Sequence, residues 1–70
     1  MNLDIIRNDI SKHVGKYVII TQRGSQNRKE IYEGYLYNIY PNIFTIKCSN
    51  SEKSFSYADV ATKDVVIKYK

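Results

Sequence analysis

The chain has 70 residues, and its 43% hydrophobic and 26% charged content excludes wholesale disorder. A chain of this length buries only roughly 60% of its unfolded surface, which leaves room for one small core. We therefore predict a single domain over residues 1–70, with an N-terminal helix in residues 1–14 and a small β-barrel in residues 15–70.

Positive charge is concentrated in one part of the chain. The formal net charge is +4, and no acidic residue occurs from Ile10 to Lys29. That stretch holds five basic residues: Lys12, Lys16, Arg23, Arg28 and Lys29. A positive field of this kind attracts polyanions or acidic protein faces. The other interpretation is an ordinary charged surface in contact with water.

The N-terminal residues and the cysteine content indicate the cellular compartment. The first residues lack the basic start and apolar run of a signal peptide, and no apolar run reaches the ~20 residues that span a bilayer. The one cysteine, Cys48, forms no internal disulfide, which suits a reducing compartment. We expect a cytoplasmic protein that does not bind membranes.

The first segment has the apolar spacing of a helix, i, i+3 and i+7. The residues at this spacing are Leu3, Ile6 and Ile10. Asn2 is the expected N-cap, and Gly15 is expected to end the helix with a left-handed residue. The predicted helix spans about Asn2 to His13 and is too short to be stable unless its apolar stripe docks on the rest of the chain.

After this helix the pattern changes to β-branched and aromatic runs. Strands are predicted at residues 17–21, 29–40, 43–48, 53–57 and 65–69, with a helical turn at residues 58–62. Gly34 interrupts the long second strand and is typical of a bulge or sharp bend. Short turns make the strands antiparallel neighbours. The predicted fold is a mainly β, five-stranded SH3-like or Sm-like barrel, with an OB-like barrel as the alternative.

The second predicted strand carries two tyrosines that alternate with small or apolar residues. If Gly34 and Leu36 point inward, then Tyr35 and Tyr37 point outward together. Exposed tyrosines serve as stacking platforms for bases or as protein-binding patches. The other interpretation is that the seven tyrosines of the chain fill the barrel and its rim, with hydroxyls reaching water.

No constellation of residues typical of an enzyme is present. His13 is the only histidine, and Cys48 lies far from it in sequence. The acidic residues form no spaced pair typical of acid–base or metal chemistry, and no glycine-rich phosphate loop occurs. We predict a non-enzymatic protein with no catalytic residues, no metal and no cofactor.

Two ordered motifs resemble a known family. Residues 34–46, GYLYNIYPNIFTI, are similar to the Veg family's pattern G-x-L followed by Y-P-x-[VI]-F-x-[VI]. Residues 54–60, SFSYADV, are similar to its pattern S-[YF]-S-Y-x-D-[VIL]. The resemblance implies a small cytoplasmic bacterial protein with an SH3-like or Sm-like barrel. It also implies stimulation of biofilm formation through matrix-gene expression, by antagonism of a transcriptional repressor.

Three functions follow as hypotheses. The first is a module that binds a regulatory protein, the second is a barrel that binds single-stranded RNA or DNA, and the third is a homo-oligomer such as a homodimer. The residues predicted to bind a partner or nucleic acid are Lys12, Lys16, Arg23, Arg28, Lys29, Tyr35 and Tyr37.

Overall fold

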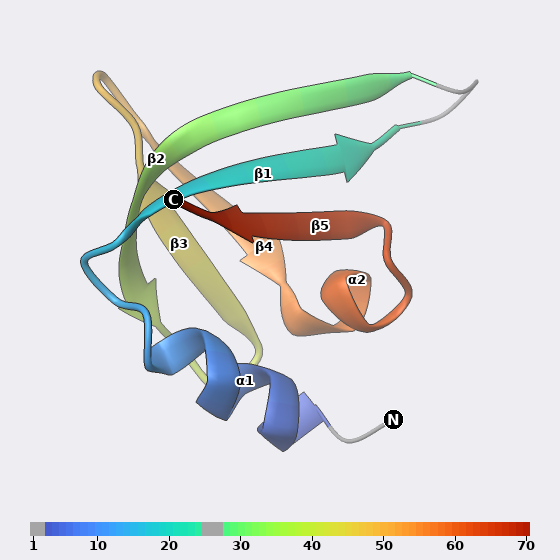
Figure 1. The fold of residues 1–70 in the computed structure, drawn as a ribbon. Coiled ribbons are helices and arrows are strands. Elements are labelled where there is room, and N and C mark those ends of the chain that lie inside the picture. The colour runs from blue at the N-terminus through green and yellow to red at the C-terminus, as the bar shows by residue number, and fades with distance from the viewer. Residues whose placement is uncertain (1–2, 25–27) are drawn as a thin grey trace.

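The chain folds into one curved antiparallel sheet with two helices (Figure 1). The computed structural model describes residues 3–24 and 28–70. The elements are α1 (Leu3–Ser11), β1 (Tyr17–Arg23), β2 (Lys29–Ile39), β3 (Ile43–Lys47), β4 (Glu52–Ser56), α2 (Tyr57–Ala61) and β5 (Val65–Tyr69). This confirms the predicted class, which is mainly β with an N-terminal helix and a short helix before the last strand.

The five strands pair in the order β4-β3-β2-β1-β5, so that β4 and β5 are the two edges of the sheet. The long strand β2 lies in the middle of the sheet, pairs with β1 on one side and β3 on the other, and curves along its length (Figure 1). The helix α2 connects the two edge strands, and Ser56 caps it because its Oγ accepts the Ala58 N–H at 3.0 Å. The ends of the curved sheet are therefore bridged by α2.

The irregularity in β2 lies two residues later than the glycine that was expected to cause it. The register of β2 against β3 shifts between Leu36 and Ile39, whereas Gly34 pairs regularly with Val18. The position requires a glycine for a different reason, because a Cβ on residue 34 would lie 2.5 Å from the Lys47 carbonyl oxygen. The glycine allows the backbones of β2 and β3 to approach closely.

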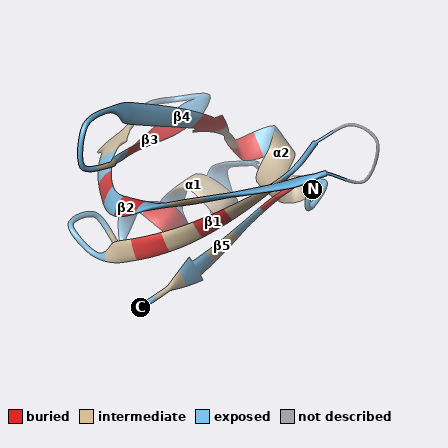
Figure 2. Cartoon of the chain, turned by 90° about the horizontal axis from the view of Figure 1, so that it is seen from above, coloured by how far each residue is buried: buried red, intermediate tan, exposed pale blue. Residues whose placement is uncertain are grey.

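The core lies inside the curve of the sheet (Figure 2). The buried apolar side chains come from α1, α2 and all five strands: Ile10, Val18, Ile20, Leu36, Phe44, Ile46, Phe55, Tyr57 and Val65. Tyr57 is the largest of the fully buried side chains, and its hydroxyl donates to the Tyr40 carbonyl at 2.8 Å. The one buried polar group of this ring is therefore satisfied.

The helix α1 docks through two residues of its predicted apolar stripe, Ile6 and Ile10, whereas the third, Leu3, is 39% exposed. Ile10 is buried and Ile6 packs against the core, whereas Ile5 on the neighbouring face is 67% exposed. None of the helices in the described part of the chain is long and apolar enough to cross a membrane.

The end of α1 differs from the prediction by two residues. The helix ends at Ser11 because the His13 N–H donates to the Ile10 carbonyl at 2.9 Å, which is an i→i+3 bond that tightens the last turn. Gly15 has a φ of 91° and provides the expected left-handed residue after the turn. The predicted N-cap Asn2 lies outside the described residues.

Candidate binding surface

The two tyrosines predicted to face outward do so. Tyr35 is 57% exposed and Tyr37 is 46% exposed, while Leu36 between them and Gly34 before them are buried. The regular alternation of a strand produces this arrangement. Two large aromatic side chains therefore lie on the outer face of β2.

Strand pairing places further residues beside them in a line across the sheet. The Lys70 N–H donates to the Tyr17 carbonyl at 3.0 Å, Tyr17 pairs with Tyr35, and Tyr35 pairs with Lys47. We call the set of Lys70, Tyr17, Tyr35 and Lys47 the tyrosine–lysine row. Two aromatic residues from the middle strands are thus flanked by a lysine on each side.

Ring contacts hold the row in a defined geometry. The rings of Tyr17 and Tyr35 meet edge to face, with centroids 5.2 Å apart and planes at 76°. Lys70 Nζ lies 5.6 Å from the centroid of the Tyr17 ring, and Lys47 Nζ lies 5.2 Å from that of Tyr37. Exposed cation–π contacts of this kind contribute roughly 0.5–1 kcal/mol each. These contacts bring the rings of Tyr17 and Tyr37 next to lysine ammonium groups on the surface.

A carboxylate lies next to the row. The Tyr17 hydroxyl donates to Glu33 Oε1 at 3.2 Å, and burial together with this bond raises the pKa of the Tyr17 hydroxyl. Beside them the surface forms a hollow of about 540 Å³. It is lined by Tyr17, Glu33, Gly34, Tyr35, Lys47, Cys48 and Ser49. The surface therefore offers aromatic faces, ammonium and hydroxyl donors, and one carboxylate acceptor.

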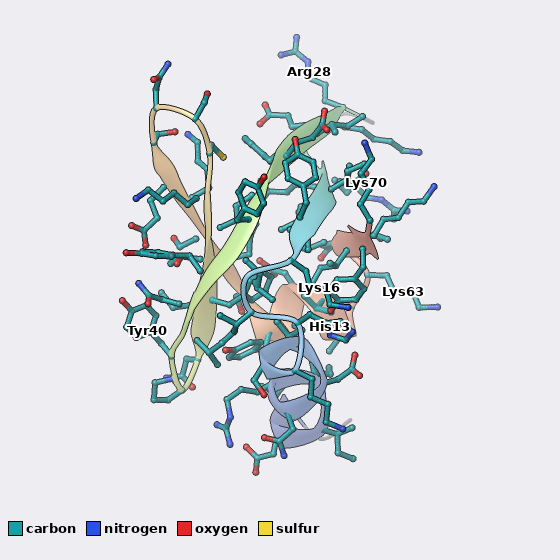
Figure 3. The ribbon with its side chains drawn as sticks, turned by 60° about the vertical axis from the view of Figure 1, so that its left-hand side comes forward. His13, Lys16, Arg28, Tyr40, Lys63 and Lys70 are labelled. Carbon is teal, nitrogen blue, oxygen red and sulfur yellow. The ribbon has the colours of Figure 1, made fainter. Side chains whose placement is uncertain are left out.

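Three of the predicted basic residues lie at the far end of the β1–β2 hairpin. Arg23 pairs with Lys29 at the end of the β1–β2 hairpin opposite the Tyr17–Tyr35 pair. The two pairs are six residue steps apart along the strands, which corresponds to roughly 20 Å. Figure 3 shows Arg28 at this tip, far from Lys16 and His13. The hairpin arginines and Lys29 are exposed and form a group separate from the tyrosines.

The two remaining predicted lysines lie between α1 and the sheet. Lys12 follows α1, and its N–H donates to the Asp9 carbonyl at 3.3 Å. The Lys16 carbonyl accepts the Leu36 N–H at 2.9 Å, which places the Lys16 backbone beside β2 near the row. Both side chains are exposed.

His13 contacts the backbone of Asp9 and the ring of Tyr69. His13 Nδ1 lies 2.9 Å from the Asp9 carbonyl, and its ring stacks on Tyr69 with centroids 4.0 Å apart. Within residues 3–24 and 28–70, no three His, Cys, Asp or Glu side chains gather as metal ligands. The tyrosine–lysine row therefore remains the strongest candidate for a functional surface.

Comparison with known families agrees with the two sequence motifs. A family model described as "Biofilm formation stimulator VEG" matches residues 1–68. The chain belongs to the Veg family. The match covers Tyr17, Tyr35 and Lys47 of the row. None of the curated proteins compared with the chain matches it.

Three members of the row were not singled out from the sequence as contact residues: Tyr17, Lys47 and Lys70. Tyr17 lies in β1, Lys47 lies in β3 and Lys70 directly follows β5, and only the pairing register brings them together. The alternation of β1 gives a partial signal for Tyr17. Val18 and Ile20 are apolar and point to the core face, so that Tyr17 points to the opposite, outer face. Register itself depends on long-range pairing that the alternation does not specify.

Proposed function

We propose that this Veg-family chain is a cytoplasmic, non-enzymatic module that stimulates biofilm formation by binding a regulatory protein. The bound protein controls transcription of matrix genes, and binding antagonises it. The family's description as a biofilm formation stimulator supports this direction. The observation that carries the proposal is the pair of exposed tyrosines, Tyr35 and Tyr37, beside Lys47 on one face of the sheet.

The composition of the surface favours a protein partner. Tyrosine provides a large rigid contact area and is enriched at the residues that dominate binding energy. The charges next to the row are of both signs, since Glu33 bonds to Tyr17 and Glu52 pairs with Lys47 across β3 and β4. A mixed pattern of this kind gives specificity toward a complementary protein face, whereas carboxylates repel a polyanion.

Single-stranded nucleic acid is the second candidate, and one observation favours it. The rings of Tyr17 and Tyr37 each carry a lysine ammonium within 6 Å of the centroid. Aromatic rings beside cations form the stacking and backbone-tracking surface of many single-strand binders. Such binding weakens steeply as salt rises, because phosphate neutralisation releases counterions.

The proposal is tested by removing the exposed rings. The double variant Tyr35→Ala/Tyr37→Ala is expected to lose biofilm stimulation when it replaces the native protein in a host lacking it. Tyr40→Ala is the matched control, because Tyr40 is 45% exposed and lies at the β2–β3 turn away from Lys70 (Figure 3). Biofilm mass and a matrix-gene reporter are measured at equal protein levels. Equal activity of the double variant and the wild type would rule out this surface.

A salt series separates the two candidates. Fluorescence anisotropy with a labelled single-stranded oligonucleotide is expected to show no binding at low salt if the partner is a protein. Binding that falls steeply with salt and is lost in Tyr35→Ala/Tyr37→Ala would assign the row to nucleic acid instead. The triple variant Arg23→Ala/Arg28→Ala/Lys29→Ala shows whether the hairpin tip contributes any such binding.

A further inference from the structure

The outer edge of β5 has backbone groups that point away from the sheet. The Arg23 N–H donates to the Asp64 carbonyl at 2.7 Å, and the Lys70 N–H donates to the Tyr17 carbonyl at 3.0 Å. Because hydrogen-bonded residues alternate along an antiparallel pair, the even-numbered residues from 64 to 70 face β1. The backbone N–H and C=O groups of Val65, Ile67 and Tyr69 therefore point outward at the free edge.

An apolar groove runs along this free edge. It has a volume of about 540 Å³ and is lined by residues of β5, α1 and α2. Its apolar lining includes Ile5, Ile6, Ile10, Val60, Val65 and Ile67. Two apolar side chains at the groove remain largely in water, since Ile5 is 67% exposed and Val66 is 52% exposed.

The other edge of the sheet is protected. The strand β4 carries Glu52, Lys53 and Ser54, all of which are exposed. Charged and polar residues on a short edge strand prevent pairing with another chain. The strand β5 has three consecutive apolar residues, from Val65 to Ile67, and one charged residue, Lys68. An edge with an apolar run beside an apolar groove is the geometry for adding a further strand.

We propose that the added strand is β5 of a second copy of this chain, paired antiparallel about a two-fold axis at Ile67. In this register Ile67 lies opposite Ile67 of the second copy, and Val65 lies opposite Tyr69. These odd-numbered residues use the outward backbone groups for hydrogen bonds. On the other face Asp64 lies opposite Lys70, and the symmetry repeats this opposite-charge pair on both sides of the axis.

The alternative registers are disfavoured by features of the same strand. A shift of two residues in one direction places Lys68 opposite Lys68 of the second copy, and like charges directly opposite are destabilising. A shift of two in the other direction places Tyr69 opposite Lys63, whose φ of 66° does not continue a strand. A shift of one residue places odd-numbered residues, whose backbone groups point outward, opposite even-numbered residues, whose backbone groups already face β1.

Pairing at this edge has two structural consequences. It joins the two five-stranded sheets into one and covers Val66 and the groove. Because the axis is perpendicular to the sheet, both tyrosine–lysine rows lie on the same side of the dimer. The proposed dimer does not depend on the proposed function. If both proposals hold, a partner protein contacts two tyrosine–lysine rows on one face of the dimer.

The solution mass tests the dimer. The wild type is expected to sediment at twice the 8.2 kDa mass of the chain. Val66→Lys places two lysines opposite each other across the axis and is expected to give the monomer mass. Ile31→Lys is the matched control, because Ile31 is an exposed apolar residue on the outer face of β2, and it is expected to remain dimeric. A wild type that stays at monomer mass at millimolar concentration would overturn the proposal.

Cysteine cross-linking tests the register. In a Cys48→Ala background, Val66→Cys and Lys68→Cys lie opposite each other as a non-hydrogen-bonded pair, with Cα atoms about 4.5 Å apart. A mixture of the two single variants is expected to form disulfide-linked dimers, since this distance falls in the disulfide range. Each variant alone is expected to form few, because the diagonal separation is roughly 7–8 Å. Cross-links in either variant alone but not in the mixture would contradict the register.

Discussion

At the scale of single residues, Tyr57 links core packing to stability at high pH. Its ring is fully buried and its hydroxyl donates to the Tyr40 carbonyl. Burial raises the pKa of the Tyr57 hydroxyl above its usual value of 10.0. The unfolded chain therefore loses this proton at a lower pH than the folded chain. The contribution to stability is fully present below pH 10 and is lost as pH rises through the folded-state pKa.

Tyr57→Phe is expected to have two effects. At neutral pH the free energy of unfolding falls by about 1 kcal/mol, because the hydrogen bond to the Tyr40 carbonyl is lost. Above pH 10 the decline of stability with pH is expected to be shallower than in the wild type. Urea unfolding at neutral and alkaline pH measures both effects. A variant with an unchanged alkaline decline would show that Tyr57 does not contribute to it.

Gly34 makes a second prediction at this scale. Gly34→Ala places a methyl group 2.5 Å from the Lys47 carbonyl oxygen, and overpacking of this kind costs roughly 1–3 kcal/mol of stability. In Gly24→Ala the new Cβ lies 3.4 Å from the Arg28 carbonyl oxygen, so that the loss is expected to be smaller. Thermal unfolding compares the two variants. Equal losses would mean that the close approach of β2 and β3 is not what requires Gly34.

At the scale of elements, the two faces of α1 differ in what they contribute. Ile10→Ala removes a buried side chain and is expected to cost about 2–5 kcal/mol. Ile5→Ala removes an exposed side chain from the same helix and is expected to change monomer stability by under about 0.5 kcal/mol. Chemical unfolding of both variants, measured on the isolated monomer, provides the comparison. A large loss from Ile5→Ala would mean that α1 docks in another orientation.

The elements themselves followed closely from sequence patterns, because those patterns are local. Strand alternation predicted the outward direction of Tyr35 and Tyr37, and the helical turn predicted at residues 58–62 corresponds to α2 at Tyr57–Ala61. The composition of the site could be predicted only in part. Lys47 and Lys70 are separated by 23 positions in the sequence, and they share a row only through strand register. Arg23 and Arg28 were predicted to bind a partner together with the tyrosines, but the length of the β1–β2 hairpin separates them.

At the scale of the whole molecule, charge and aromatic residues are distributed over distinct surfaces. The hairpin tip holds Arg23, Arg28 and Lys29, the outer face holds the tyrosine–lysine row, and the β5 edge holds the apolar groove. A small sheet with a single core has most of its residues near the surface, so that separate faces can serve separate contacts. The row serves the proposed regulatory partner, while the edge serves the second copy.

The most direct test of the central claim is photo-cross-linking in living cells. A photoreactive phenylalanine analogue is placed at position 35 or, as the control, at the similarly exposed position 40. The account predicts that position 35 gives a discrete cross-linked protein species that position 40 does not give, and that this species contains a transcriptional regulator. Cross-links to nucleic acid from position 35, or the same products from both positions, would contradict the claim that the tyrosine–lysine row binds a regulatory protein.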